Sequence, residues 1–157
     1  MTIVAAIASS RAEPLAVGQG FPAPDEHGLE GTWPDTSGAR VVVVDFWASW
    51  CPPCRAAFPV LDAVQAEFGP RGVRVVAVSV DQNRGAMEAF LKKHPVSFSV
   101  VRDAGMKLVQ RVDVPTMPTT FVLDGRGVVR FVHAGFEGDA TRDRLRGEIA
   151  ALLEETP

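Results

Sequence analysis

Two cysteines, Cys51 and Cys54, are the residues of this chain whose type and spacing point most directly to chemistry. They lie in the segment Trp50-Cys51-Pro52-Pro53-Cys54, and the sequence contains no other cysteine. Three interpretations are open for such a pair: a structural disulfide, half of a zinc site, or a dithiol that cycles between an oxidised and a reduced form.

The first two interpretations fit the sequence poorly. For a loop this short, the loop-entropy relation gives a disulfide only about 2 kcal/mol of stabilisation. A structural zinc site requires four ligands, and the chain adds only His27, His94 and His133, which do not form a pair with metal-ligand spacing. A chain of 157 residues that is 46% hydrophobic can form a stable core without a disulfide or a structural zinc ion. A redox dithiol is therefore favoured, and no metal ion is expected.

Redox chemistry requires one thiol with a lowered pKa and a second thiol close enough to resolve a mixed disulfide. A valine-rich strand pattern ends just before the cysteines and a helical pattern begins at them, so Cys51 is expected at a helix N-terminus. The helix dipole stabilises a thiolate there, which makes Cys51 the expected nucleophile. Cys54, one turn into the helix, is expected to be more buried and to resolve the mixed disulfide. Pro52 and Pro53 are compatible with a first helical turn.

Asp45 is the next candidate, because it follows four valines on a strand expected to be central. Burial without a charged partner raises the pKa of a carboxyl group toward neutrality. Such a group can take the proton of Cys54 during resolution, directly or through a water molecule. The alternative is a strand-end aspartate that reaches solvent.

The segment Val44–Cys54 resembles the active-site segment of the thioredoxin superfamily. Pro59 matches the proline that kinks the active-site helix in that family, Met117–Phe121 resembles its cis-proline segment, and Gly135 matches a glycine beside the same groove. Within the superfamily, the chain is most similar to the TlpA-like (TlpA/ResA-type) thiol-disulfide oxidoreductases. The reason is an extra helical segment and strand between Val73–Val80 and the cis-proline.

This resemblance implies a thioredoxin-like α/β fold, in which helices flank a central mixed sheet, and a cis peptide bond before Pro118. It also implies a substrate-binding surface, formed by Trp50, Pro52, Pro53, Met117, Pro118 and Gly135. For Trp50 and Met117 the alternative is ordinary packing in the core. Two departures are visible: Ala57 stands where TlpA-like proteins often have glutamate, whereas Asp45 matches the classical thioredoxins.

The function implied by the resemblance is that of a thiol-disulfide oxidoreductase with the Cys51–Cys54 pair in place of any cofactor. Reduction of protein disulfides is the favoured direction, and oxidation of protein thiols is the alternative. The partners implied by the resemblance are protein disulfide substrates, such as apocytochrome c or proteins of metal-site assembly, and an upstream electron donor in a membrane. A tryparedoxin-like electron donor to peroxidases and a non-catalytic thiol- or metal-binding module are the alternatives. A thiol peroxidase fits poorly, because Val44 and Ala48 occupy the Pro and Thr/Ser positions of its Pro-x₃-Thr/Ser-x₂-Cys motif.

The elements that position these residues alternate along the chain. Strands are predicted at 41–47, 73–80, 97–101, 119–123 and 128–133, with helices at 51–68, 84–94, 105–111 and 138–155. A further short strand is predicted near Leu29–Trp33, and Asp124–Gly127 predicts a hairpin turn. A β-α-β start followed by a hairpin and a terminal helix predicts a mixed sheet flanked by helices.

Length predicts a single domain over residues 20–157, preceded by a flexible leader or truncated signal at 1–19. The net charge of −3 and the scattered arginines disfavour nucleic-acid binding, and a monomer is expected. The resemblance favours the periplasm, with the cytoplasm as the alternative. No stretch approaches the length of a transmembrane helix.

Overall fold

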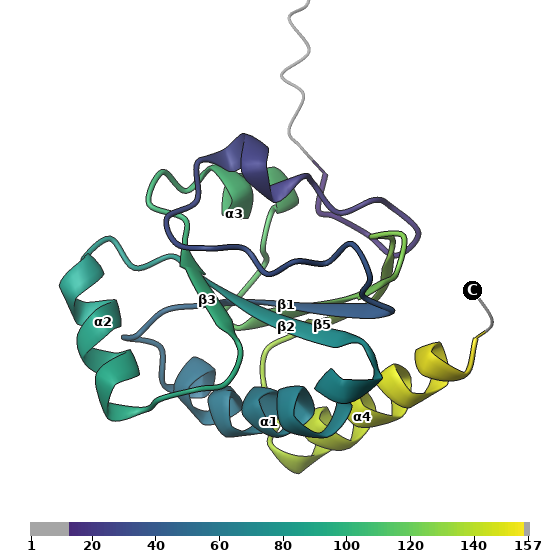
Figure 1. Ribbon diagram of the computed structural model, residues 1–157. Coiled ribbons are helices and arrows are strands. Elements are labelled where there is room, and N and C mark those ends of the chain that lie inside the picture. The colour runs from purple at the N-terminus through teal and green to yellow at the C-terminus, as the bar shows by residue number, and fades with distance from the viewer. Residues whose placement is uncertain (1–12, 156–157) are drawn as a thin grey trace, which may run out of the picture.

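Five strands form one mixed sheet in the order β3-β2-β1-β4-β5, in a computed structural model that describes residues 13–155 (Figure 1). The strands are β1 (Val41–Trp47), β2 (Val73–Ser79), β3 (Ser99–Arg102), β4 (Thr119–Asp124) and β5 (Val129–Ala134). The helices are α1 (Pro52–Phe68), α2 (Arg84–Lys93), α3 (Lys107–Val112) and α4 (Asp139–Glu154), with two short 3₁₀ helices, η1 (Pro24–His27) and η2 (Gly69–Arg71).

The central strand β1 is parallel to β2 and antiparallel to β4. Helices α1 and α4 lie on one face of the sheet, whereas α3, η1 and the N-terminal segment lie on the other (Figure 1). All seven residues of β1 are buried, because both faces of this strand are covered. A strand that is buried on both faces is expected to be hydrophobic at consecutive positions, and the four valines of β1 meet this expectation.

The strands and helices predicted from residue 41 onward are confirmed, with each end within two residues of its predicted position. The short strand predicted near Leu29–Trp33 is wrong. Only Glu30 forms a bridge there, an isolated one to Arg102. Its two backbone hydrogen bonds, Glu30 N to Arg102 O at 2.9 Å and Arg102 N to Glu30 O at 2.8 Å, do not extend into a ladder.

Part of the predicted leader packs against the domain. Leu15 is buried and its amide donates to the carbonyl of Val112 at 3.0 Å. Gly18 N donates to Val129 O at 2.8 Å, and Val129 N donates to Gln19 O at 2.8 Å. Residues 15–19 are thus attached to the folded unit, whereas residues 1–12 of the predicted leader lie outside the described residues. None of the described helices is both long and apolar enough to cross a membrane.

Candidate active site

The two cysteines form a disulfide at the N-terminus of α1, with 5.3 Å between their Cα atoms. Cys51 is the N-cap residue, in an extended conformation, and its sulfur accepts a hydrogen bond from the Cys54 amide at 3.3 Å. Cys54 is fully buried and Cys51 is 4% exposed, so the expected nucleophile is the more accessible of the two. Pro52 and Pro53 occupy the first turn, as predicted, where a missing N–H costs no helical hydrogen bond.

Asp45 lies at the middle of β1, between Ala77 on β2 and Thr120 on β4. Its side chain is fully buried, so the alternative of a strand-end aspartate in contact with solvent is excluded. Thr120 Oγ1 donates to Asp45 Oδ1 at 2.7 Å, whereas Oδ2 has no hydrogen-bond partner among the described residues. Burial raises the pKa of Asp45 to about 7, although the Thr120 hydroxyl, by stabilising the carboxylate, opposes the shift.

The segment resembling a cis-proline loop lies at the same edge of the sheet as the cysteines. Thr119 pairs with Phe46, so β4 begins where β1 ends, and the residues before Thr119 lie beside the chain that leads to Cys51. The Met117–Pro118 peptide bond is cis, as the resemblance implies. Gly135 N donates to the Pro118 carbonyl at 2.7 Å, which fixes Gly135 next to this loop.

The aromatic and apolar residues of the predicted surface differ in exposure. Trp50 is 68% exposed, so packing in the core, its alternative role, is excluded. Met117 is half-buried and packs against the core, and the rest of its side chain is accessible, so its place in the substrate-binding surface stays a prediction. Pro52 and Pro53 are exposed, whereas Pro118 is buried. An exposed indole therefore lies directly beside the redox pair.

One group of polar residues at this edge was missed by the sequence analysis. The buried carboxylate of Asp81 accepts hydrogen bonds from Ser49 N at 2.9 Å, from Ser49 Oγ at 2.6 Å and from Ser79 Oγ at 2.7 Å. Asp81 therefore holds Ser49, the residue that precedes Trp50. The available signal was topological: β1 and β2 are parallel, so residues just beyond their carboxyl ends meet at one edge.

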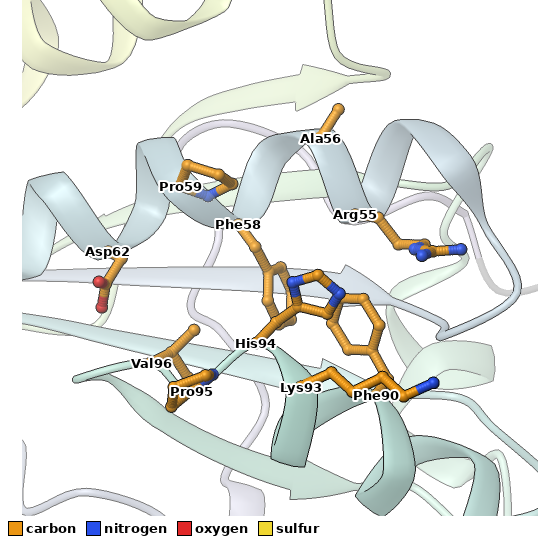
Figure 2. A pocket seen from close by; sticks show the side chains of 10 residues that line it. All are labelled: Arg55, Ala56, Phe58, Pro59, Asp62, Phe90, Lys93, His94, Pro95 and Val96. Atoms are coloured by element: carbon orange, nitrogen blue, oxygen red, sulfur yellow. The ribbon is translucent and has the colours of Figure 1, made fainter.

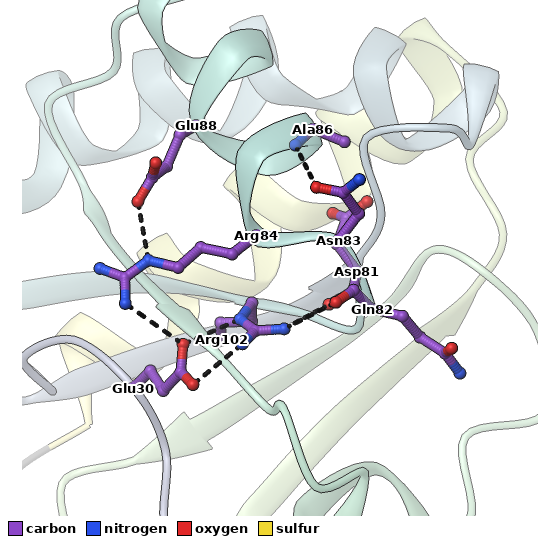
Figure 3. Close-up of polar contacts among 8 residues, drawn as sticks. All are labelled: Glu30, Asp81, Gln82, Asn83, Arg84, Ala86, Glu88 and Arg102. Carbon is purple, nitrogen blue, oxygen red and sulfur yellow. Dashed lines mark hydrogen bonds and ion pairs between the residues drawn. The ribbon is translucent and has the colours of Figure 1, made fainter.

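The same group extends to the N-terminal segment through Arg102 (Figure 3). Arg102 donates to the carbonyls of Asp81 and Gln82 at 3.0 and 3.1 Å, and to both carboxylate oxygens of Glu30 at 2.9 Å each. This bidentate pair is a favourable geometry for arginine and carboxylate. It explains why Glu30 forms its isolated bridge to Arg102.

The potential metal ligands of residues 13–155 are dispersed over the fold. In that part of the chain, no group of three or more His, Cys, Asp or Glu side chains is arranged to hold a metal ion. His133 Nε2 instead lies 2.6 Å from Glu148 Oε2, and the His94 ring stacks on Phe90 with 4.6 Å between centroids. Ala57, where TlpA-like proteins often have glutamate, is buried in α1.

Comparison with known proteins gives a consistent result. The sequence profile of the AhpC/TSA family matches residues 17–132. The thiol-disulfide oxidoreductase ResA of Bacillus subtilis is 34% identical over 110 residues, which are 64% of this chain and 62% of that protein. A second ResA, from Oceanobacillus iheyensis, is 32% identical over 106 residues, and the chain spans 54% of its length. The chain thus spans little more than half the length of these curated relatives.

Among solved structures, a protein assigned as the thiol:disulfide interchange protein DsbE of Chlorobium tepidum is 36% identical, with a TM-score of 0.81, and the match covers 88% of this chain and 99% of that one. A secreted disulfide oxidoreductase of Mycobacterium tuberculosis, homologous to DsbE of Escherichia coli, is 26% identical with a TM-score of 0.67 over 82% of this chain and 99% of that one. These similarities confirm the thioredoxin-like fold. The positions of the peroxidatic motif are occupied here by the buried Val44 and Ala48.

Proposed function

The chain belongs to the AhpC/TSA family, and from that premise we propose that it is a thiol-disulfide oxidoreductase that reduces disulfide bonds in other proteins. The observation that carries the proposal is the Cys51–Cys54 disulfide at the N-terminus of α1. The relatives named ResA and DsbE support it, because thiol-disulfide exchange is the activity in their names.

The first step of the proposed cycle begins with both cysteines reduced. The Cys51 thiolate attacks one sulfur of a substrate disulfide, that disulfide breaks, and its second sulfur leaves as a thiolate that takes up a proton. Cys51 is then joined to the substrate by a mixed disulfide. The Cys54 amide, which contacts the Cys51 sulfur at 3.3 Å, stabilises the attacking thiolate together with the helix dipole.

In the second step, Cys54 loses its proton and attacks the Cys51 sulfur. The mixed disulfide breaks, the substrate leaves as its second thiol, and the Cys51–Cys54 disulfide forms. The substrate has then gained two electrons and two protons, so a dithiol donor must reduce the protein again. Asp45 is proposed as the group that accepts the Cys54 proton, because a buried carboxyl with a pKa of about 7 can both take and release a proton near neutrality.

Substrate contacts are proposed for the residues around the redox pair. The exposed Trp50 offers an apolar surface beside Cys51, and Met117, Pro118 and Gly135 line the adjacent edge of the sheet. Pro52 and Pro53 complete this surface in the first turn of α1. The cysteine pair is the redox centre, and the proposed cycle requires no further cofactor.

The partners and the compartment are proposed from the resemblance to TlpA-like proteins rather than from a contact in the structure. We propose a periplasmic location, which is supported by a structural relative that is a secreted disulfide oxidoreductase. There its substrates would be protein disulfides, such as those of apocytochrome c or of metal-site assembly, and a membrane-bound dithiol protein would return it to the reduced form. We propose that it acts as a monomer.

The proposed activity is tested by reduction of insulin disulfides with dithiothreitol as the electron source. The wild-type protein is expected to accelerate the reaction at catalytic concentration, and Cys51→Ser to abolish the acceleration. Cys54→Ser should accumulate a mixed disulfide through Cys51, detectable by mass spectrometry, because the resolving thiol is missing. A wild-type protein that gives no acceleration, and that retains stoichiometric metal after reduction, would instead support a metal-binding module.

A further inference from the structure

A groove of about 580 Å³ lies between α1 and the C-terminal end of α2 (Figure 2). It begins at Arg55, the residue after Cys54, and extends along α1 as far as Asp62. None of the contacts proposed above for the redox reaction uses it. Its volume lies within the range of about 300–1,000 Å³ that is typical of ligand sites.

The floor of the groove is aromatic and firmly packed. Phe58 of α1 and Phe90 of α2 are 3% and 8% exposed, and their ring centroids are 5.4 Å apart in an edge-to-face arrangement. Both rings pack against Trp47 at the end of β1, at 4.4 and 5.3 Å. The floor is thus a fixed apolar surface that requires little rearrangement to accept an apolar side chain.

The groove carries two cationic groups that have no anionic partner among the described residues, Arg55 on α1 next to Cys54 and Lys93 on α2 (Figure 2). The Arg55 guanidinium lies over the Phe90 ring, 5.3 Å from its centroid, and has no ion pair or hydrogen bond with any residue in 13–155. Lys93 likewise has no carboxylate within 4.0 Å among the described residues. Most other arginines do have carboxylate partners; those of residues 71, 84, 102, 126, 130, 142, 144 and 146 form ion pairs.

The opposite end of the groove has the opposite charge. Asp62 lies there, well separated from Arg55 in Figure 2, and its Oδ1 accepts hydrogen bonds from Ser97 N and Ser97 Oγ, both at 2.6 Å. The groove therefore has an aromatic floor, a cationic end beside the redox pair and an anionic end away from it. A ligand with a negative charge is favoured only at the end near Cys54.

We propose that this groove docks an acidic segment of the protein whose disulfide is exchanged, with an apolar side chain against the aromatic surface of Phe58, Phe90 and His94 and acidic side chains at Arg55 and Lys93. The inference rests on the proposed function, because exchange requires a partner protein to approach Cys51. Charge complementarity supports an acidic partner: Arg55 offers planar paired donors that match a carboxylate. The chain as a whole has a net charge of −3, so the cationic end of the groove is opposite in sign to the net charge of the protein.

The direct test measures binding without redox chemistry. The probe is a short cysteine-free peptide with a leucine flanked by glutamates, added to the oxidised, ¹⁵N-labelled protein and followed by NMR. The expected result is amide shifts concentrated at Arg55, Phe90 and His94 that weaken in about 0.5 M salt, because the charged groups are exposed. The same peptide with glutamines should shift these amides several-fold less.

Three results would overturn the proposal: equal binding of the glutamine peptide, shifts elsewhere on the surface, or no shifts at millimolar peptide. Equal shifts with succinate at the same concentration would also overturn it, because the groove would then be a site for small anions.

Single substitutions test whether the cationic residues of the groove bind the acidic peptide. Arg55→Gln and Lys93→Gln are each expected to weaken binding of the acidic peptide by about two- to fivefold, as is typical of exposed ion pairs. Lys92→Gln is the matched control, since Lys92 is also in the last turn of α2 but does not line the groove. A loss of the same size in Lys92→Gln would show a general charge effect and contradict the docking site.

Failure of the docking proposal and failure of the proposed function are distinguishable. If the peptide does not bind but the protein reduces insulin, the docking site is wrong and the oxidoreductase stands. If the peptide binds at the groove but the protein does not reduce insulin, the function assigned to Cys51 and Cys54 is wrong.

Discussion

At the scale of single residues, Asp45 is the group whose chemistry departs most from that of a surface side chain. Its pKa is raised from 3.8 to about 7, chiefly because burial disfavours the carboxylate. A difference of this size corresponds to about 4 kcal/mol between the protonation states. The folded state binds the proton more tightly than the unfolded state, so the stability contributed by protonated Asp45 is full below about pH 4 and is lost as pH rises through about 7.

Replacement of Asp45 by asparagine should therefore change stability in a pH-dependent way. At pH 5 the wild-type carboxyl is still protonated in the folded state but is largely ionised in the unfolded state, so the variant should already be more stable by about 1–2 kcal/mol. At pH 8, above both pKa values, the variant should be more stable by about 4 kcal/mol, because it avoids a buried carboxylate. Urea unfolding of the oxidised proteins at both pH values measures this difference.

The exposed Asp25 provides the control, since Asp25→Asn should change stability little at either pH. An equal effect of Asp45→Asn at pH 5 and pH 8 would contradict the raised pKa.

The burial of Asp45 could be predicted from sequence, because it follows four valines on a central strand. Its partner Thr120 could not, although it belongs to the segment that resembles a cis-proline loop. The pairing depends on the register between β1 and β4, which places residues 75 positions apart side by side. No local pattern specifies that register.

At the scale of elements, the chain before Cys51 is held by the group around Asp81. Asp81→Asn should lower the unfolding free energy by about 2 kcal/mol, because a carboxylate that accepts three hydrogen bonds is replaced by a group that cannot accept them all. Ser49→Ala should cost about 1 kcal/mol, and the double variant should lose less than the sum, since the two residues share two of these bonds. Chemical denaturation of the three variants measures these costs.

Gln82→Ala is the matched control, because the exposed Gln82 accepts from Arg102 through its backbone carbonyl, which the substitution retains. If the losses of unfolding free energy caused by Ser49→Ala and Asp81→Asn were strictly additive, the two residues would not stabilise this segment through shared hydrogen bonds.

The positions of the helices and long strands could be predicted because hydrophobic periodicity and turn residues are local signals. The error near Leu29–Trp33 has a physical cause. Glu30 is held by the Arg102 side chain and by an isolated bridge rather than by a strand ladder. Such a long-range attachment leaves no periodic pattern in the sequence.

At the scale of the whole molecule, the N-terminal segment contributes to the stability of the domain. Leu15→Ala should lower the unfolding free energy by about 2 kcal/mol, because it removes a side chain that is 8% exposed and packs against the core. Val17→Ala is the matched control, since Val17 is 61% exposed and should cost about 0.5 kcal/mol or less. Thermal unfolding of both variants compares them, and equal losses would show that Leu15 is not part of the core.

The central claim, that Cys51 and Cys54 form the redox centre of a reductant, is tested most directly by the equilibrium reduction potential of this pair. It is measured by alkylation trapping of the protein in defined thiol-disulfide buffers. The account predicts a value below about −230 mV, in the range of reducing dithiols such as thioredoxin. A value above about −150 mV would contradict it, because the Cys51–Cys54 disulfide would then oxidise substrate thiols, whereas in a reductant it forms as a substrate disulfide is reduced.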